Sequence, residues 1–182
     1  MEFLPTAISD VVVIKPRVFE DARGFFMETW EARKFAKANL RWDFVQDNHS
    51  RSEKHTLRGL HYQIKQPQGK LVRVVAGEVF DVVVDLRRSS RTFGQWVGTT
   101  LSAETKQQLW VPPGFAHGFL VTSESAEFIY KCTDYYAPQF ERTLTWNDPQ
   151  IGIDWPLPPG TAPRLSEKDE AGSLLREAET YP

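Results

Sequence analysis

The sequence predicts an all-β protein, a β-jelly-roll with short peripheral helices, on three observations. Short segments rich in Val, Phe and Trp recur along the 182 residues. Gly, Pro, Ser and Asn separate these segments, as in chains that form sandwiches or barrels. Helical composition is confined to two stretches. Strands are therefore expected, in chain order, at 11–15, 25–30, 44–47, 57–64, 70–76, 78–86, 95–101, 107–111, 118–122 and 127–133.

Two helices are expected outside these strands. The first covers residues 31–40, and the second begins at Ser166, a residue type that caps helices, and reaches about residue 178. Four of the twelve prolines fall within 155–163, which predicts an extended strap before the second helix. No repeat, linker or low-complexity tract divides the chain, so we expect one domain over residues 1–182.

Composition limits the functional classes. The chain is 41% hydrophobic and 25% charged, which indicates a globular protein. Its net charge of −2 argues against general nucleic-acid binding. No apolar run approaches the roughly 20 residues of a membrane span, so no membrane association is expected. Cys132 is the single cysteine, which excludes an intrachain disulfide, and we expect a cytoplasmic location.

Strand alternation indicates which polar side chains point inward. Tyr130 alternates with Phe128 and Cys132, so its ring is expected inside, where its hydroxyl needs a partner. Asp81 and Asp85 likewise share a face with valines. Carboxylates in such positions either meet cations or line a wet cavity.

His61 is the candidate general base. A neutral imidazole has a pKa of about 6.5, close to the pH at which a cytoplasmic base works. Gly59 is expected to mark a bulge that brings Arg58 and His61 to one side of their strand. Three carboxylates are candidates for the partner that would hold this imidazole: Asp81, Asp85 and Asp169.

Further residues suit chemistry on an anionic substrate. Lys70 follows a Gln-Gly turn, and an inward ammonium there would stabilise a developing oxyanion. Arg23 and Arg58 are candidates for gripping a phosphate, because the guanidinium fork matches phosphate oxygens. His117 follows Pro-Pro-Gly, so we expect it on a constrained turn at a strand mouth, as a polar contact in the ligand cavity.

No metal or other cofactor is expected. Barrels of this kind that bind metal often carry a His-x-His pair, but the residue two after His61 is Gln63. The remaining ligands would all have to come from remote segments. The pattern therefore favours proton abstraction without a metal.

These segments together resemble the dTDP-4-dehydrorhamnose 3,5-epimerase family. The resemblance runs from about Phe3 to Ala178 and is specific because many motifs occur in one order. The motifs are DARGFF at 21–26, FVQDNHS at 44–50, LRGLH at 57–61, QGKLVR at 68–73, GEVFDVVVD at 77–85, FGQW at 93–96, PGFAHGF at 113–119, WNDP at 146–149, DWP at 154–156 and LSEKD at 165–169.

The resemblance implies a cupin-like jelly roll that works as a homodimer with shared active sites. Strands within residues 1–50 would be exchanged with the partner, so that Arg23 and Glu28 complete the partner's nucleotide site. His61 would be the base, Asp169 its carboxylate partner and Tyr130 the acid, and the sequence does not exclude Asp81 as that partner. The remaining matched positions are Lys70 and His117 around the sugar, Tyr136 stacking on thymine, and Gln46, Asn48, Arg58, Glu141 and Lys168 contacting the ligand.

The implied reaction converts dTDP-4-dehydro-6-deoxy-D-glucose to dTDP-4-dehydro-L-rhamnose in dTDP-L-rhamnose biosynthesis. Both C3 and C5 would be epimerised by proton abstraction through enolate intermediates. Three alternatives stay open: a single-site epimerase of a related dTDP-deoxysugar pathway, a metal-dependent cupin oxygenase, and a non-catalytic jelly roll that binds sugar nucleotides.

Overall fold

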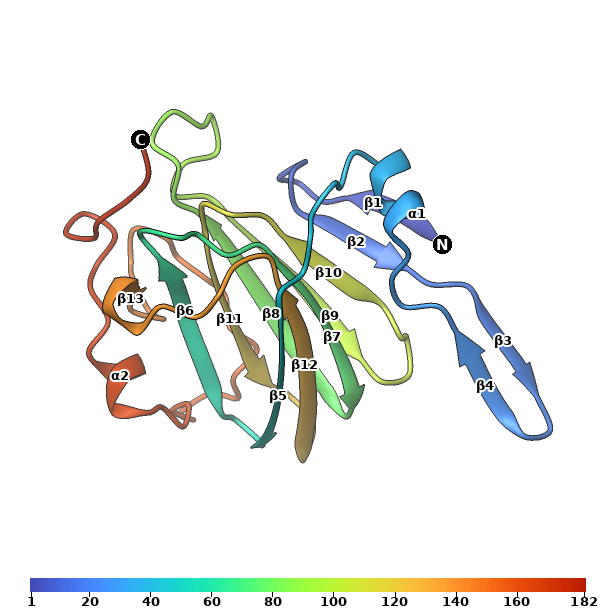
Figure 1. Ribbon diagram of the computed structural model, residues 1–182. Coiled ribbons are helices and arrows are strands. Elements are labelled where there is room, and N and C mark those ends of the chain that lie inside the picture. Colours follow the sequence, from blue (N-terminus) through green and yellow to red (C-terminus); the bar gives the residue numbers. More distant parts are fainter.

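The computed structural model describes residues 1–182, and its strands form two antiparallel sheets and a separate hairpin (Figure 1). One sheet has the order β1-β2-β10-β7-β12-β5, the other β13-β6-β11-β8-β9. The strands are β1 (Glu2–Pro5), β2 (Val12–Lys15), β3 (Val18–Asp21), β4 (Gly24–Met27), β5 (Gln46–Glu53), β6 (Leu57–Gln63), β7 (Lys70–Ala76), β8 (Glu78–Asp85), β9 (Trp96–Ser102), β10 (Gln108–Val111), β11 (Phe115–Val121), β12 (Ser125–Cys132) and β13 (Glu141–Thr143). The helices are α1 (Ala32–Lys37), a 3₁₀ turn at Pro138–Phe140 and α2 (Glu167–Glu170). The expected all-β, cupin-like jelly roll is confirmed.

The five-stranded sheet is buried on both faces. Its inner face contributes Val83 and Phe119 to a core shared with Phe128 of the six-stranded sheet. Its outer face packs Leu120 against Trp155 and other residues of the C-terminal segments. All seven residues of β11 are consequently buried, and a polar side chain on this strand must face either a partner or a cavity.

Sequence periodicity missed three short strands and misplaced two features. β1, β3 and β13 were not expected, and β5 starts at Gln46 and continues through polar residues to Glu53. β5 pairs with β12 along its whole length, so backbone pairing extends it beyond its hydrophobic residues. His117 lies within β11 and not on a turn, which corrects the expectation drawn from Pro-Pro-Gly.

The C-terminal helix is much shorter than the expected 166–178. Ser166 caps α2 as expected, its hydroxyl accepting the Asp169 N–H, but the helix ends after one turn. At Gly172 the chain runs so close to the segment that follows β13 that an added Cβ would lie 2.6 Å from Thr145 N. Ser173 then bonds to the backbone there, so tertiary pairing replaces the helix. No helix has the length and apolar character needed to cross a membrane.

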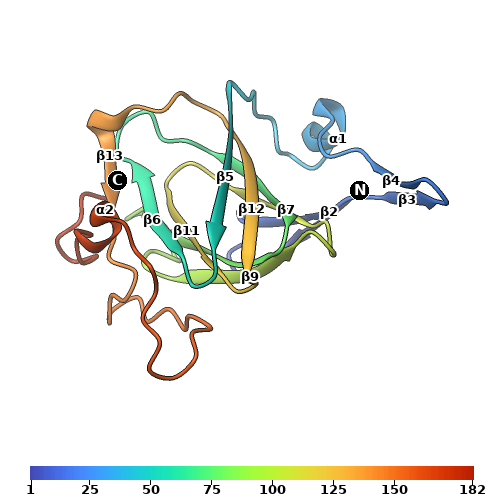
Figure 2. The ribbon, with the colours of Figure 1, turned by 90° about the horizontal axis from the view of Figure 1, so that it is seen from below.

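The β3–β4 hairpin extends away from both sheets, on the side opposite α2 and β13 (Figures 1 and 2). Its strands pair only with each other. Phe19, Phe25 and Phe26 on this hairpin are 51%, 59% and 70% exposed. These neighbouring aromatic rings form an exposed apolar surface on the hairpin.

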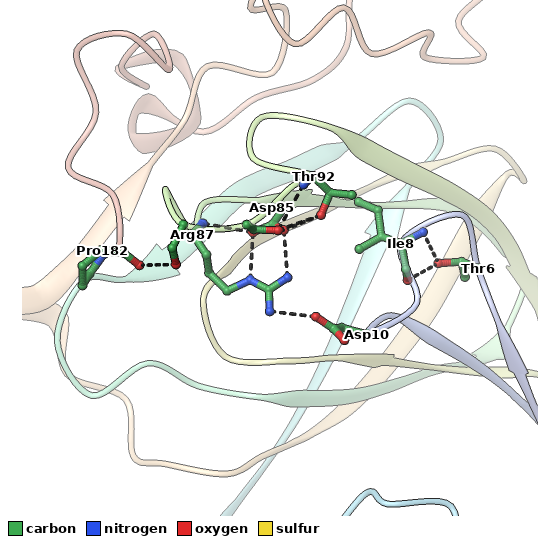
Figure 3. Close-up of polar contacts among 9 residues, drawn as sticks. Thr6, Ile8, Asp10, Asp85, Arg87, Thr92 and Pro182 are labelled. Atoms are coloured by element: carbon green, nitrogen blue, oxygen red, sulfur yellow. Dashed lines mark hydrogen bonds and ion pairs between the residues drawn. The ribbon is translucent and has the colours of Figure 1, made fainter.

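A buried carboxylate network joins the end of β8 to the N-terminal turn (Figure 3). Asp85 is fully buried and accepts hydrogen bonds from the backbone and guanidinium of Arg87 and from the hydroxyls of Ser90 and Thr92. The Arg87 guanidinium also donates to Asp10 at 2.7 Å. These donors outweigh the cost of burial and lower the pKa of Asp85 to about 2. The inward Asp85 thus meets a cation, one of the two outcomes its position allowed.

We expect Asp85→Asn to lower the free energy of unfolding by about 2 kcal/mol at neutral pH. The folded pKa lies below the unfolded value of about 3.9, so this stability is present above pH 4 and is lost as the pH falls toward 2. Urea unfolding at several pH values measures this loss of stability. The control is Glu124→Gln, which removes an exposed ion pair with Lys54 and should change the free energy of unfolding little. An Asp85→Asn deficit that does not shrink between pH 5 and pH 2 would contradict this origin.

Candidate active site

His61 on β6 contacts the carboxylate of Asp169, which lies 108 positions away in the chain. The distance from His61 Nε2 to Asp169 Oδ1 is 2.6 Å. An ionised carboxylate only accepts hydrogen bonds, so Nε2 carries the proton and Nδ1 carries the free electron pair of the neutral ring. Nδ1 makes no hydrogen bond within the chain, and no buried side-chain nitrogen or oxygen lacks a partner. Nδ1 is therefore open to solvent, where it can take up a proton.

Asp169 is held as an anion by three donors. Besides His61, the hydroxyl of Ser166 donates to Oδ2 at 2.6 Å and the backbone N–H of Gly59 donates to Oδ1 at 3.2 Å. Although burial opposes them, these hydrogen bonds lower the pKa of Asp169 to about 2. The carboxylate therefore stays ionised and stabilises the imidazolium that forms when His61 accepts a proton.

The structure decides among the carboxylates that the sequence left open. Asp169 is the partner of His61. Asp81 contacts His117 Nε2 instead, at 2.9 Å and 3.0 Å from its two oxygens. Asp85 belongs to the network at the end of β8. Sequence spacing carried no information on the two carboxylate–imidazole pairings, because they join residues 108 and 36 positions apart in the chain.

The bulge expected at Gly59 is confirmed. Pairing between β6 and β11 shifts register between Arg58 and His61, so β6 has one residue more than β11 over this stretch. Gly59 has φ +136°, and a Cβ there would lie 2.5 Å from the Cα of Gly118. Glycine permits both the backbone conformation and the close approach of the strands. The bulge places Arg58 and His61 on the same cavity.

The cavity has a volume of about 360 Å³ and lies between the two sheets. Ten of the site residues expected from the sequence line it: Gln46, Asn48, Arg58, His61, Lys70, His117, Tyr130, Tyr136, Glu141 and Lys168. Asp169 lies behind His61. The cavity is also lined by residues that the sequence did not indicate: His49, Ser50, Gln68, Gly118, Phe119 and Phe128. Ser50 follows Gln46 and Asn48 on alternate positions of β5, a signal that was lost when that strand was expected to stop at residue 47.

Lys70 and Tyr130 approach this cavity from the six-stranded sheet, opposite His61. Neither the ammonium of Lys70 nor the hydroxyl of Tyr130 has a hydrogen-bond partner in the chain. Because no buried side-chain nitrogen or oxygen lacks a partner, both groups are accessible from the cavity that they line. Burial lowers the pKa of Lys70 and raises the pKa of Tyr130 to about 12. A cation and a phenol are thus free to bind a ligand that reaches His61 from the other side.

The rim of the cavity combines cations with an exposed aromatic ring. Glu141 accepts from Tyr136 Oη and from Lys168 Nζ, both at 2.9 Å. Arg58 donates to the hydroxyl of Ser52 at 2.9 Å. Tyr136 is 52% exposed, so one face of its ring is available for stacking. Cations beside a stacking platform suit a ligand that carries both phosphates and a planar base.

Arg23 and Glu28 do not reach the cavity of their own chain. Arg23 lies in the β3–β4 hairpin, where its side chain is 90% exposed and pairs with Asp21 at 2.6 Å. Glu28 pairs with Lys34 at 2.6 Å. Both of these surface ion pairs are weak enough to be exchanged for another partner.

The assembled site can move protons on a carbon acid. It has a base held by a fixed anion, an unpaired cation for an oxyanion, and a phenol on the opposite wall. The structure contains no group of three or more His, Cys, Asp or Glu side chains placed to share a metal ion.

Comparisons with known proteins give one consistent result. The family model described as dTDP-4-dehydrorhamnose 3,5-epimerase matches residues 5–177. A dTDP-4-dehydrorhamnose 3,5-epimerase from Pseudomonas aeruginosa is 60% identical over 177 residues, 97% of each chain. Among solved structures, a dTDP-6-deoxy-D-glucose-3,5-epimerase from Legionella pneumophila in complex with dTDP-4-keto-L-rhamnose has a TM-score of 0.94 and 52% identity, covering 98% of this chain and 94% of its own.

A more distant structure differs in the reaction ascribed to it. It is a 3′-monoepimerase from Streptomyces bikiniensis in complex with dTDP-quinovose. Its TM-score is 0.88 at 33% identity, covering 95% of this chain and 87% of its own. The same fold therefore occurs with epimerisation at one carbon or at two.

Proposed function

The chain belongs to the dTDP-4-dehydrorhamnose 3,5-epimerase family, and from this we propose how His61, Lys70 and Tyr130 perform its reaction. The enzyme is an isomerase that epimerises C3 and C5 of dTDP-4-dehydro-6-deoxy-D-glucose, giving dTDP-4-dehydro-L-rhamnose in dTDP-L-rhamnose biosynthesis. The observation that carries the mechanism is the entry of His61 and Tyr130 into one cavity from opposite sheets. Inversion at carbon requires a base and an acid on two faces.

Each inversion is an exchange of protons through an enolate. His61 Nδ1 removes the hydrogen from C3 or C5, and the electron pair delocalises onto the C4 oxygen. Asp169 stabilises the imidazolium, a charge-assisted hydrogen bond of about 1.5–3 kcal/mol. Lys70 donates to the C4 oxygen, and losing such a donor typically costs roughly 10²–10³ in rate. Tyr130 returns a proton to the opposite face of the carbon, which completes the inversion.

Binding of the nucleotide is assigned to the rim. Arg58 and Lys168 are proposed to hold the diphosphate, and Tyr136 to stack on thymine. Gln46 and Asn48, whose side chains hydrogen-bond to each other at 3.1 Å, line the same wall. Glu141 orients both Tyr136 and Lys168. A cytoplasmic location, expected from the single cysteine, is part of the same proposal.

Turnover in deuterium oxide tests the reaction. We expect deuterium at both C3 and C5 of the product, read by NMR or mass spectrometry. Label at one carbon alone would favour the second candidate, a single-site epimerase like the Streptomyces bikiniensis relative. Absence of label, with dTDP still bound, would leave a sugar-nucleotide-binding protein without this activity.

The activity should depend on pH through two groups of the cavity. Burial lowers the pKa of His61 below 6.5, with Lys168 and Lys70 adding repulsion and Asp169 opposing them. His61 acts as the neutral base, so we expect kcat/KM to fall on the acid side only below pH 6.5. Lys70 acts as the cation, and burial lowers its pKa below 10.5, so the alkaline fall should begin before pH 10.5. Initial rates between pH 4.5 and 11 measure both limbs, and an acid limb above pH 7 would contradict the assignment of His61.

We infer that two chains form a dimer in which each site is completed by the partner's β3–β4 hairpin. The hairpin carries exposed aromatic rings and leaves Arg23 far from its own cavity. β5, which lines the cavity, is an edge strand of its sheet with unpaired backbone groups. An edge strand next to a nucleotide site offers a second chain both pairing and access.

Complementation between inactive variants tests this arrangement. Arg23→Ala and His61→Ala chains, each inactive or weak alone, are unfolded together and refolded as a mixture. If Arg23 serves the partner's site, a mixed dimer contains one site with both native residues, and about a quarter of the wild-type activity should return. Refolding each variant alone is the control. Unchanged low activity in a mixture shown to contain mixed dimers would place Arg23 in its own chain's site.

A further inference from the structure

Asp81 is the least supported buried carboxylate near the site. It is fully buried on β8, and the Nε2–H of His117 is its single donor. By contrast, Asp85 on the same strand accepts from five N–H and O–H groups. Burial accordingly raises the pKa of Asp81, whereas at Asp85 the hydrogen-bond donors outweigh burial and lower the pKa. A carboxylate buried at this cost is explained better by its effect on His117 than by stability.

The contact with Asp81 fixes which nitrogen His117 presents to the cavity. Nε2 donates to the carboxylate, so Nδ1 of the neutral ring carries a lone pair and no hydrogen. Nδ1 has no partner within the chain, and no buried side-chain nitrogen or oxygen lacks one. Nδ1 therefore opens onto the cavity that His117 lines, and there it accepts hydrogen bonds.

Its position puts this acceptor beside the reacting sugar. His117 on β11 pairs directly with His61 on β6, so the two imidazoles are neighbours across the strands. Lys70, on the facing sheet, supplies an N–H donor to the same cavity. The C4 oxygen of the sugar needs a hydrogen-bond donor, and Lys70 provides it. The sugar hydroxyls at C2 and C3 are donors, and they need an acceptor of the kind that His117 provides.

We propose that Asp81 is a positioning residue that holds His117 in its Nε2–H form, so that Nδ1 reads a hydroxyl next to the reacting carbons by accepting its hydrogen. This inference rests on the proposed function for the identity of the sugar. His117 therefore accepts a hydrogen bond from the sugar, whereas Lys70 donates one. The C2 or C3 hydroxyl is then a requirement for binding and not only a bystander.

Nitrogen-15 NMR of histidine-labelled, ligand-free protein tests the tautomer, with His117→Asn used to assign its signals. We expect His117 Nε2 to have the shift of a protonated nitrogen and Nδ1 that of an unprotonated one. A proton on Nδ1, with or without one on Nε2 at pH 7.5, would overturn the proposal. This readout does not depend on turnover, so it stands or fails apart from the proposed function.

Binding of stable analogues tests whether His117 Nδ1 accepts a hydrogen bond from a sugar hydroxyl. Wild-type affinity is compared, by calorimetry, for dTDP-6-deoxy-D-glucose and its 2-fluoro and 3-fluoro derivatives, in which fluorine cannot donate. We expect one derivative to bind about 10-fold more weakly, which identifies the hydroxyl. Equal affinity for all three compounds would contradict an acceptor role. Affinity for dTDP alone is measured alongside to show that the nucleotide site is intact.

Asp81→Asn separates positioning from a merely structural role. The asparagine amide can donate to His117 Nε2, so the Nδ1–H form should appear in the NMR spectrum and the preference for hydroxyl over fluorine should shrink. Asp43→Asn, on an exposed loop, is the control that changes neither. An Asp81→Asn protein with native tautomer and native preference would refute the role of Asp81. If this variant does not fold, the two wild-type measurements still decide the proposal.

Discussion

Replacing His61 by asparagine is expected to abolish deuterium uptake at both C3 and C5 while dTDP binding stays nearly unchanged. Asparagine keeps a polar side chain near Asp169 but has no basic nitrogen. General base catalysis typically contributes 10²–10⁴ in rate, and the neighbouring imidazole of His117 is assigned to a sugar hydroxyl and not to a carbon-bound hydrogen. We therefore expect kcat to fall by at least about 10³-fold. The measurement is the exchange rate by NMR together with the Kd for dTDP by calorimetry.

His55→Asn is the matched control. His55 lies outside the cavity at φ +63°, a conformation that asparagine tolerates better than most residues. Its exchange rate should equal that of the wild type. If His61→Asn loses exchange at one carbon and retains it at the other, two different bases serve the two carbons. That result would require a second base and would sink the single-base mechanism.

Tyr130→Phe is expected to separate proton removal from inversion. The ring remains and only the hydroxyl is lost, so the base, the cation and the nucleotide site are unchanged. The enolate should still form at His61 and pick up solvent deuterium on the same face, whereas proton return on the opposite face loses its donor. We expect formation of inverted product to fall by roughly 10²–10³-fold, with exchange into recovered substrate much less affected.

The burial that raises the pKa of Tyr130 to about 12 fits this role. The phenol remains protonated across the working range, and an enolate is basic enough to take its proton. Tyr135→Phe, at a 62% exposed position near the rim, is the control with unchanged rates. Equal losses of exchange and of inversion in Tyr130→Phe would show that the hydroxyl acts before or during proton removal. Its assignment as the acid on the opposite face would then be wrong.

Much of this architecture was readable from the chain because strand formation leaves a local signal. Alternation placed Tyr130 inward beside Phe128; Phe128 is buried in the core, and Tyr130 is partly buried against it. A glycine between Arg58 and His61 predicted the bulge, since few other residues fit the positive φ and the close approach of the neighbouring strand there. Ser166 predicted the start of α2. The ordered motifs identified the family, as the comparisons confirm.

Other features have no local signal. β5 and β13 exist because neighbouring strands supply their hydrogen bonds, whatever their own hydrophobicity. The helix expected over 166–178 gave way to one turn because Ser173 pairs with backbone near Thr143 and Thr145. His117 became an interior strand residue because β11 is covered on both faces.

The chain by itself therefore determined the class of fold, the inward polar residues and the kind of chemistry. Tertiary structure alone decided which carboxylate holds which imidazole: Asp169 for His61 and Asp81 for His117. The difference lies in how far along the chain each kind of interaction reaches. Periodicity and turn chemistry act over a few residues, whereas a hydrogen bond of 2.6 Å between side chains 108 positions apart depends on how whole sheets and their connections pack.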